Sequence, residues 1–304
     1  MDATLLRNIL DNLNNKGFND NMFCPHCKSN NIIKNGKYKG KQRFRCKDCG
    51  KNFNSLTNTP IAMSHIPEKW PLFIECLIKG RSLRAAEAEI GVSYVTLFYW
   101  RHKLMRALKS TENNPLAGDV EADDTFLAYS EKGSRKILGR KSKKNGNKYC
   151  ARENKKVLLL VAVDHSGHLL LEASASKNSY VNLICKSLGA VVNPKVVFCS
   201  NCKTFYKHFA SLNGIKQHFR VSHYNRTEKN NIDLAYTNLR TVEVWLDRFK
   251  GVASKYLNSY LSLYNCLRKG NFDRTEIGIN NFIKALRYVN INENYRSIRA
   301  LKIA

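Results

Sequence analysis

Four cysteines near the beginning of the chain have the type and spacing of a metal site. Cys24 and Cys27 form one C-x2-C pair, and eighteen residues separate it from a second pair, Cys46 and Cys49. Two such pairs bring four thiolates around one point, which is the ligand set of a structural zinc ion. We therefore predict that these cysteines bind Zn²⁺. His26, inside the first pair, is expected to be a bystander because four ligands already complete the shell.

The segment between the two pairs predicts short strands around Gly36 and Gly40, which would complete a zinc ribbon. It has too few apolar side chains to fold alone, so the metal would supply the folding free energy. The segment is also basic, and Arg43 and Arg45 are candidates for contacts with phosphate groups. The alternative is a purely structural clip without such contacts.

Acidic residues cluster in the segment VEADDT, which alternates as a strand does: Glu121, Asp123 and Asp124. Side chains two residues apart share one face of a strand, so Glu121 and Asp123 point to one face and Asp124 to the other. Clustered acids in an otherwise basic chain indicate a functional site. The alternative is a strand-end acid that only aids solubility.

A helical pair is predicted between the ribbon and these acids. Ser82 is the expected N-cap of a first helix, Gly91 makes the turn, and Ser93 caps a second helix. In the DNA-reading form of such a pair, the second helix enters the major groove. Candidates for DNA contacts are Ser93, Tyr94, Arg101 and Lys103. The expected small core is Leu83, Ala86, Ile90, Val95 and Leu104. A helical hairpin without DNA contacts is the alternative.

The composition favours a polyanionic partner. Of 304 residues, 51 are Lys or Arg and 24 are Asp or Glu, which gives a formal charge of +27. With 43% hydrophobic residues, wholesale disorder is excluded, and nucleic acid is the expected partner. No apolar run approaches the roughly 18 residues of a membrane span, and no secretory signal is recognisable. We expect no membrane contact and a cytoplasmic or nucleoid location in a prokaryote, or a nuclear one in a eukaryote.

Strands and helices alternate after a hinge expected at 110–118, which indicates an α/β layered domain. The predicted elements are a buried hairpin over 157–175, a helix over 181–192, a strand over 195–200, a helix over 203–212 and a long helical stretch over 232–267.

Several polar residues of this domain have simple interpretations. Asp164 is expected to cap the hairpin turn, and Cys199 and Cys202 to be ordinary thiols because no second pair accompanies them. A basic run between 130 and 156 is expected to be a solvated loop, in which Arg135 and Lys136 could lie along a DNA backbone.

The order of these motifs resembles the insertion-sequence transposases of the Merlin-like (ISXO-like) group. The segments that carry the resemblance are CPHC, RCKDCGKNFNSLTNTPIA, RSLRAAEAEIGVSYVTLFYWRHKL, DVEADDTFLAYSEKGSRK and RFKGVASKYLNSYL. It covers about 23–267 and leaves the tail unexplained. It implies an α/β fold with an RNase H-like mixed sheet flanked by helices. The implied domains are an N-terminal helix and zinc ribbon at 1–55, a helix-turn-helix region at 56–112, an RNase H-like domain at 118–268 and a basic C-terminal tail at 269–304.

The resemblance also implies a chemistry. Members of this group act on the terminal inverted repeats of a mobile element, using an acidic pair completed by Glu or Asn together with a divalent metal. Cleavage of a phosphodiester by water and then attack by a 3′-hydroxyl are served by two metal ions about 3.5 to 4 Å apart, held by carboxylate oxygens. Asp123 matches the first catalytic Asp of the family, whereas Asp124 stands where Glu is usual.

Two catalytic positions depart from the family pattern. The second Asp, usually followed by Gly, is replaced by Asn201-Cys202, which keeps an oxygen ligand but loses the charge. We expect about a thousandfold loss of activity, near 4 kcal/mol. For the third position, the longer alignment of the end motif selects Tyr236. A local alignment selects Glu243, with Lys250 meeting phosphate seven residues on.

We therefore predict an insertion-sequence DNA transposase that binds double-stranded terminal inverted repeats as a homo-oligomer. It would carry structural Zn²⁺ and, if active, Mg²⁺ or Mn²⁺ held by Asp123, Asn201 and Glu243. The alternative is a catalytically inactive, transposase-derived DNA-binding protein. A third hypothesis is a zinc-ribbon transcription factor with an unrelated α/β domain, which a sheet without the RNase H-like strand order would favour.

Overall fold

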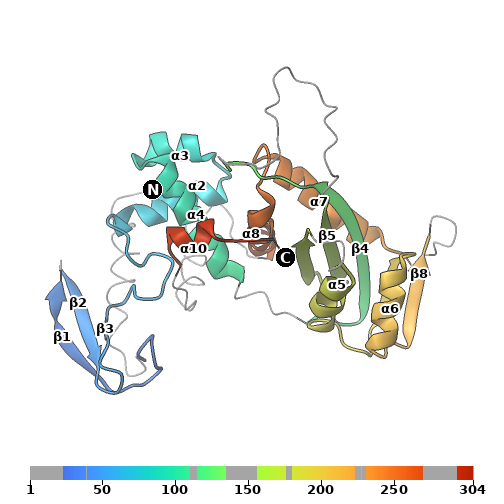
Figure 1. Cartoon of the computed structure of the whole chain (residues 1–304), viewed down its shortest axis with the longest axis horizontal. Coiled ribbons are helices and arrows are strands. Elements are labelled where there is room, and N and C mark those ends of the chain that lie inside the picture. The colour runs from blue at the N-terminus through green and yellow to red at the C-terminus, as the bar shows by residue number, and fades with distance from the viewer. Residues whose placement is uncertain are drawn as a thin grey trace. The chain divides into compact units, whose positions relative to one another are not determined.

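The computed structural model describes residues 23–38, 40–109, 115–134, 156–175, 180–222, 227, 231–269 and 293–303. The chain divides into two compact units (Figure 1). One comprises Met1–Thr111 and Cys266–Ala300, and the other comprises Glu112–Asn265 and Leu301–Ala304. The helix predicted ahead of the cysteines lies outside the described residues.

The ribbon of the first unit is a three-stranded antiparallel sheet. Its strands, in spatial order, are β1 Ile32–Tyr38, β2 Lys41–Cys46 and β3 Asn52–Phe53. The rings of Phe44 and Phe53 lie 5.7 Å apart and share a small core with the buried Cys24 and Cys46. β3 was not predicted, and it supplies Phe53, one of the few apolar side chains of this core.

Three helices follow the ribbon, of which the first continues from the single turn η1, Pro67–Lys69. They are α2 Trp70–Ile78, α3 Leu83–Ile90 and α4 Tyr94–Lys109. Ser82 Oγ accepts a hydrogen bond from Ala85 N at 3.1 Å, and Gly91 ends α3 at φ 68°. Thr96 N donates to Ser93 Oγ at 3.4 Å. The caps and the turn of the helical pair thus lie where the sequence predicts them.

The core of the helical pair differs from expectation at Val95, and the predicted core residue Leu83 is only half-buried. Ala86, Ile90 and Leu104 are buried as predicted, but Val95 is 45% exposed, so its prediction as a core residue is wrong. Val95 and the buried Leu97 are two residues apart, which places them about 200° apart around a helix. Because Leu97 faces the core, Val95 must face away from it.

A short C-terminal helix, α10 Tyr295–Arg299, packs against α4 within the first unit. Arg106 forms an ion pair with Glu293 at 2.9 Å, and Arg299 Nε donates to Tyr99 Oη at 2.7 Å. This part of the tail, which the family resemblance leaves unexplained, therefore braces the second helix of the pair.

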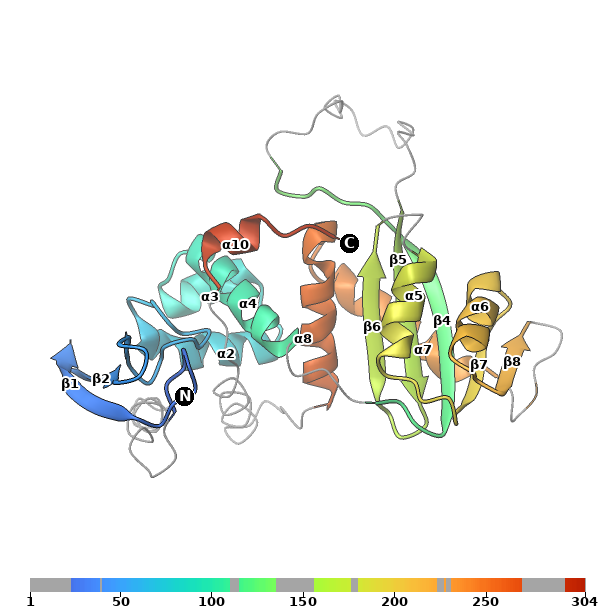
Figure 2. The same cartoon turned by 60° about the horizontal axis from the view of Figure 1, so that its bottom comes forward.

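The second unit is built on a five-stranded mixed sheet in the order β6-β5-β4-β7-β8 (Figure 2). The strands are β4 Asp119–Ala128, β5 Lys156–Asp164, β6 Leu169–Ser174, β7 Val197–Asn201 and β8 Gln217–Val221. β5 runs antiparallel to β4 and β6, whereas β7 runs parallel to β4 and β8. This is the expected RNase H-like order, so the predicted fold class is confirmed and the hypothesis of an unrelated α/β domain is disfavoured.

Helices cover both faces of this sheet. α5 Tyr180–Gly189 and α6 Thr204–Leu212 lie on one face, and α7 Asp233–Asp247 lies on the other (Figure 2). The alternation of β4 explains the first layer, because Val120 and Ala122 share a core with Ile184 of α5 and Phe209 of α6. β5 is buried along nearly its whole length, which accounts for its continuous apolar run.

The long helical stretch predicted over 232–267 is wrong, because the chain breaks after Asp247. Lys250 and Gly251 have φ values of 51° and 97°, in the left-handed region that a helix interior excludes. A short turn, η3 Ser254–Tyr256, then leads into α8 Leu257–Lys269.

The start of α8 covers the edge of the sheet that β6 forms. Asn258 Nδ2 donates to Ala173 O at 3.0 Å, and Asn258 Oδ1 accepts from Ala173 N at 2.7 Å. The side-chain amide thus pairs with β6 as a neighbouring strand would, which protects an edge that could otherwise recruit another chain. Among the described helices, none is long and apolar enough to cross a membrane.

Candidate active site and metal centre

The four predicted zinc ligands meet at one point. One sulfur from each of Cys24, Cys27, Cys46 and Cys49 lies within 4.8 Å of the others. The Cys24–Cys49 and Cys27–Cys46 sulfur pairs are 3.7 and 3.5 Å apart. A tetrahedral site with zinc–sulfur bonds of about 2.3 Å requires sulfurs about 3.8 Å apart. The four thiols therefore fit a structural zinc ion.

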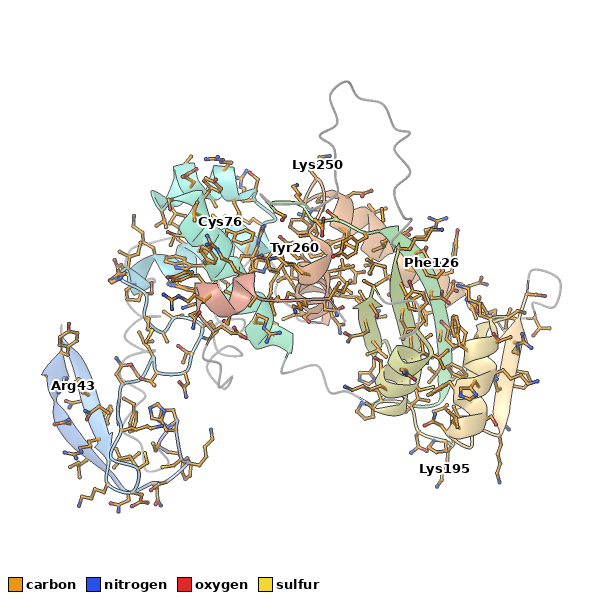
Figure 3. The ribbon with its side chains drawn as sticks, viewed as in Figure 1. Arg43, Cys76, Phe126, Lys195, Lys250 and Tyr260 are labelled. Carbon is orange, nitrogen blue, oxygen red and sulfur yellow. The ribbon has the colours of Figure 1, made fainter. Side chains whose placement is uncertain are left out.

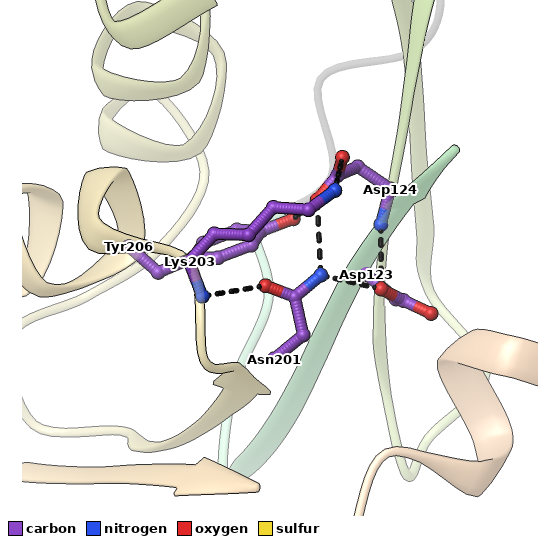
Figure 4. A network of polar contacts seen from close by, with 5 residues as sticks. All are labelled: Asp123, Asp124, Asn201, Lys203 and Tyr206. Atoms are coloured by element: carbon purple, nitrogen blue, oxygen red, sulfur yellow. Dashed lines mark hydrogen bonds and ion pairs between the residues drawn. The ribbon is translucent and has the colours of Figure 1, made fainter. Parts of the chain in front are cut away.

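Asp123, in the middle of β4, and Asn201, at the end of the neighbouring strand β7, lie together, as their predicted roles require. β4 and β7 are parallel and paired through Ala122 and Ser200, so the next residue of each strand lies side by side. Asn201 Nδ2 donates to Asp123 Oδ1 at 2.7 Å and to Asp124 Oδ1 at 3.0 Å (Figure 4). The amide therefore joins two carboxylates that β4 alone would point to opposite faces.

Two residues that the sequence analysis did not select complete this network. The Lys203 ammonium forms an ion pair with Asp124 Oδ2, and Tyr206 Oη donates to Asp124 Oδ1 at 3.2 Å (Figure 4). Lys203 N also donates to Asn201 Oδ1 at 3.1 Å, which fixes the orientation of the amide. Asp124 thus accepts hydrogen bonds from three side chains.

Burial governs the electrostatics of this cluster. It raises the pKa of Asp123, and the nearby Asp124 carboxylate raises it further, while the hydrogen bond from Asn201 opposes the shift. Burial and the Asp124 carboxylate raise the pKa of Tyr206 well above its ordinary value, so its hydroxyl stays a donor. Lys203 is the cation that compensates the pair of carboxylates.

The arrangement does not fit a two-metal cage. Asn201 presents its NH₂ group to the carboxylates, and its only oxygen accepts from the backbone of Lys203. Asp124 is engaged by three donors. Among the contacts of the described residues, only Asp123 Oδ2 at this cluster accepts no hydrogen bond and points outward (Figure 4). One carboxylate oxygen is too few for two hard cations.

Glu121 lies on the same face of β4 as Asp123 but contacts a different element, α7. Its carboxylate is 3% exposed, and Oε2 accepts from Leu234 N at 2.8 Å and from Ala235 N at 3.0 Å. Oε1 lies 3.3 Å from His165 Nε2. Glu121 therefore caps the N-terminus of α7 and ties it to the central strand.

The other candidates make contacts with residues outside the Asp123 network. Glu243 pairs with Arg240 on α7 at 2.9 Å, and no described hydrogen bond joins it to the Asp123 network. Asp164 accepts from His168 N at 2.8 Å across the β5–β6 turn, as predicted. Tyr236 is 46% exposed, and its hydroxyl accepts from Arg240 Nε.

The basic residues that were predicted to contact DNA, in the ribbon and between α7 and α8, differ in how exposed they are. Arg45 is exposed, and Arg43, whose strand Figure 3 shows, is half-buried and donates to Asn35 O at 3.3 Å. Lys250 is exposed, and its carbonyl accepts from Lys132 Nζ at 2.7 Å. Arg135 and Lys136 lie outside the described residues.

The candidates of the helical pair divide between surface and core. Ser93 and Tyr94 are exposed, and the Arg84 guanidinium lies 3.7 Å from the centre of the Tyr94 ring. Arg101 is only 9% exposed, and Lys103 Nζ donates to Ala62 O at 3.0 Å. Arg101 and Lys103 therefore contact other parts of the protein.

Two stretches of the chain match known families. Residues 115–264 match the ISXO2-like transposase domain, and residues 20–50 match the InsA N-terminal domain, a zinc ribbon. A Halobacterium salinarum protein described as an uncharacterised protein in transposable element ISH50 is 35% identical over 114 residues. That match covers 37% of this chain and 38% of the relative, so the shared region is well under half of either.

An RNase H-like sheet that brings Asp123 and Asn201 together, preceded by a four-cysteine ribbon, is the architecture of a DDE-type transposase domain. Residues 115–264 thus form an ISXO2-like transposase domain, and residues 20–50 form an InsA-type zinc ribbon.

Proposed function

We propose that this chain binds double-stranded DNA at the terminal inverted repeats of its element, through the ribbon and the α3–α4 pair. The exposed first turn of α4 carries this proposal. Ser93, Tyr94 and Val95 are all exposed there, whereas the helix is buried further along. In DNA-reading helical pairs, the N-terminal residues of the second helix contact the base edges.

The ribbon would add phosphate contacts through Arg45, and Arg43 would position that strand. In this assignment residues 1–55 and 56–112 bind DNA, residues 118–268 hold the candidate cleavage site, and the described part of the tail, 293–303, supports α4. We further propose a homo-oligomer on DNA and a location wherever the element's DNA lies, the nucleoid in a prokaryote.

DNA binding is tested by fluorescence anisotropy with a terminal-repeat duplex and a scrambled duplex. We expect Tyr94→Ala to weaken repeat binding roughly 5- to 150-fold, which corresponds to about 1–3 kcal/mol, with a smaller effect on the scrambled duplex. Arg45→Ala should weaken both duplexes alike and lower the salt slope by about 0.9. Lys195→Ala, an exposed lysine of the other unit (Figure 3), is the charge-matched control. Equal losses in all three variants, or no preference for the repeat, would contradict the proposal.

Cleavage is a separate matter. The Asn201 amide and the Lys203 ammonium already satisfy the carboxylates that a divalent cation would need. This supports the alternative of a DNA-binding protein whose Mg²⁺- or Mn²⁺-dependent cleavage is lost or strongly attenuated. The proximity of Asp123 to Asn201 favours the second candidate, a residual nuclease. Strand nicking of the terminal-repeat duplex in Mn²⁺ decides between them.

A further inference from the structure

An exposed aromatic ring lies close to the Asp123 network. Phe126, labelled in Figure 3, is 43% exposed. It stands two residues beyond Asp124 and therefore lies on the same side of β4. A single exposed Phe is ordinary on a protein surface. This one has two ammonium groups beside it, from Lys203 at 5.4 Å and from Lys156 at 5.7 Å from the ring centre.

The surroundings hold the ring in place. Tyr180 of α5 packs against it with 5.6 Å between centroids, and Tyr180 Oη donates to Lys156 O at 3.2 Å. The two ammonium groups are within the roughly 6 Å of a cation–π contact to the ring centre and flank the ring. Phe126 is still 43% exposed, so a flat ligand could reach it.

A chain of contacts connects this ring to the candidate active site. Lys203, beside Phe126, pairs with Asp124, and Asn201 joins Asp124 to Asp123. All of these residues lie in the second unit, on β4, β7 and the start of α6. Asp123 points to the opposite face of β4, so a DNA strand that runs from Asp123 past Asn201 at the end of β7 would bring a nearby nucleotide to Phe126.

Aromatic rings flanked by cations are the surface that single-stranded nucleic acid requires, since a base stacks on the ring and phosphates pair with the cations. We propose that Phe126, Lys156 and Lys203 form a binding site for an unpaired nucleotide of the DNA strand that passes Asp123. The proposal rests on the proposed DNA binding. A base inside a duplex is stacked on both faces and cannot use the ring, so the ligand is a frayed or single-stranded nucleotide.

The experiment compares a blunt duplex with the same duplex carrying a three-nucleotide unpaired tail that contains 2-aminopurine. For the wild-type chain we expect tighter binding of the tailed duplex and a change in 2-aminopurine fluorescence on binding. Phe126→Ala should weaken tailed-duplex binding roughly 5- to 150-fold and abolish that change, while blunt-duplex affinity stays unaltered. Phe126→Trp should retain both, because it keeps a stacking ring.

Phe219→Ala, which removes a similarly exposed ring from β8, is the matched control and should behave as wild type. Lys156→Gln should lower the salt slope for the tailed duplex by about 0.7. Equal affinity of the wild type for tailed and blunt duplexes, or an unchanged fluorescence response in Phe126→Ala, would overturn this inference while leaving DNA binding intact. Absence of binding to either duplex would instead overturn the proposed function together with this site.

Discussion

Asn201 directs its amide nitrogen, and not its amide oxygen, at Asp123, with 2.7 Å between Nδ2 and Oδ1. The backbone of Lys203 fixes that orientation by donating to Asn201 Oδ1. A neutral donor therefore occupies the position that we assign to the family's second catalytic Asp. Both oxygens of Asp124 and one oxygen of Asp123 accept hydrogen bonds from the protein's own groups.

Restoring the carboxylate should make the site dependent on a cation. In Asn201→Asp, a third negative charge would adjoin Asp123 and Asp124, and two hydrogen bonds to them would be lost. We expect destabilisation of about 1–3 kcal/mol in EDTA, reversed by Mn²⁺, since the ion then binds the folded state only. Thermal unfolding with and without Mn²⁺ measures this effect.

The same variant should nick a terminal-repeat duplex about a thousandfold faster than the wild type. Asn193→Asp, an exposed turn residue whose oxygen already accepts from Lys195 N, is the control and should show neither effect. An absence of nicking by both the wild type and the Asn201→Asp variant would favour the inactive DNA-binding protein.

Asp123 should destabilise the fold once it ionises. Burial raises its pKa in the folded state above the ordinary value of 3.8, so the charged form is disfavoured there. The folded state is therefore penalised as pH rises from 3.8 through the raised pKa, and the penalty is absent below 3.8. We expect Asp123→Asn to gain stability relative to the wild type between about pH 4 and 7 in EDTA. Urea unfolding across that range tests the sign, and a constant difference would contradict it.

Local patterns in the sequence were sufficient for several features. The Ser82 cap and the Asp164 turn each join a side chain to a backbone group only a few residues away. The zinc site is marked by a repeated C-x2-C pair. The continuous apolar run of β5 likewise indicates that this strand is buried. These signals need no knowledge of distant contacts.

Features that depend on distant partners could not be predicted. β8 exposes most of its side chains, so its sequence shows no alternation of apolar and polar residues. Only its pairing with β7 identifies it as a strand. Lys203 is one of 51 basic residues, and only the fold brings it to Asp124. Glu121 shares a face with Asp123, but its partners at the start of α7 are more than a hundred residues away.

Glu121 should be a residue that positions α7. Glu121→Ala leaves the N–H groups of Leu234 and Ala235 without their acceptor, at a cost of about 1–3 kcal/mol. Urea unfolding measures that loss, and hydrogen exchange should show faster exchange at the first turn of α7 than elsewhere. Glu121→Gln keeps one acceptor oxygen and should lose less. Asp119→Asn, at the exposed start of β4, is the control. If Glu121→Ala lost no more unfolding free energy than Asp119→Asn, the capping role would be contradicted.

Zinc should hold the ribbon together independently of the second unit. The core there contains Phe44 and Phe53 beside the cysteines, too little apolar surface to fold without metal. We expect one zinc ion per chain, and its removal by a chelator or by Cys46→Ser should expose residues 23–53 to rapid hydrogen exchange while β4 and β5 stay protected. Cys202→Ser, an exposed cysteine outside the cluster, should retain the ion. Because the ribbon carries Arg45, the zinc-free protein should also lose affinity for scrambled duplex DNA, and a metal-free chain with unchanged exchange would contradict the assignment.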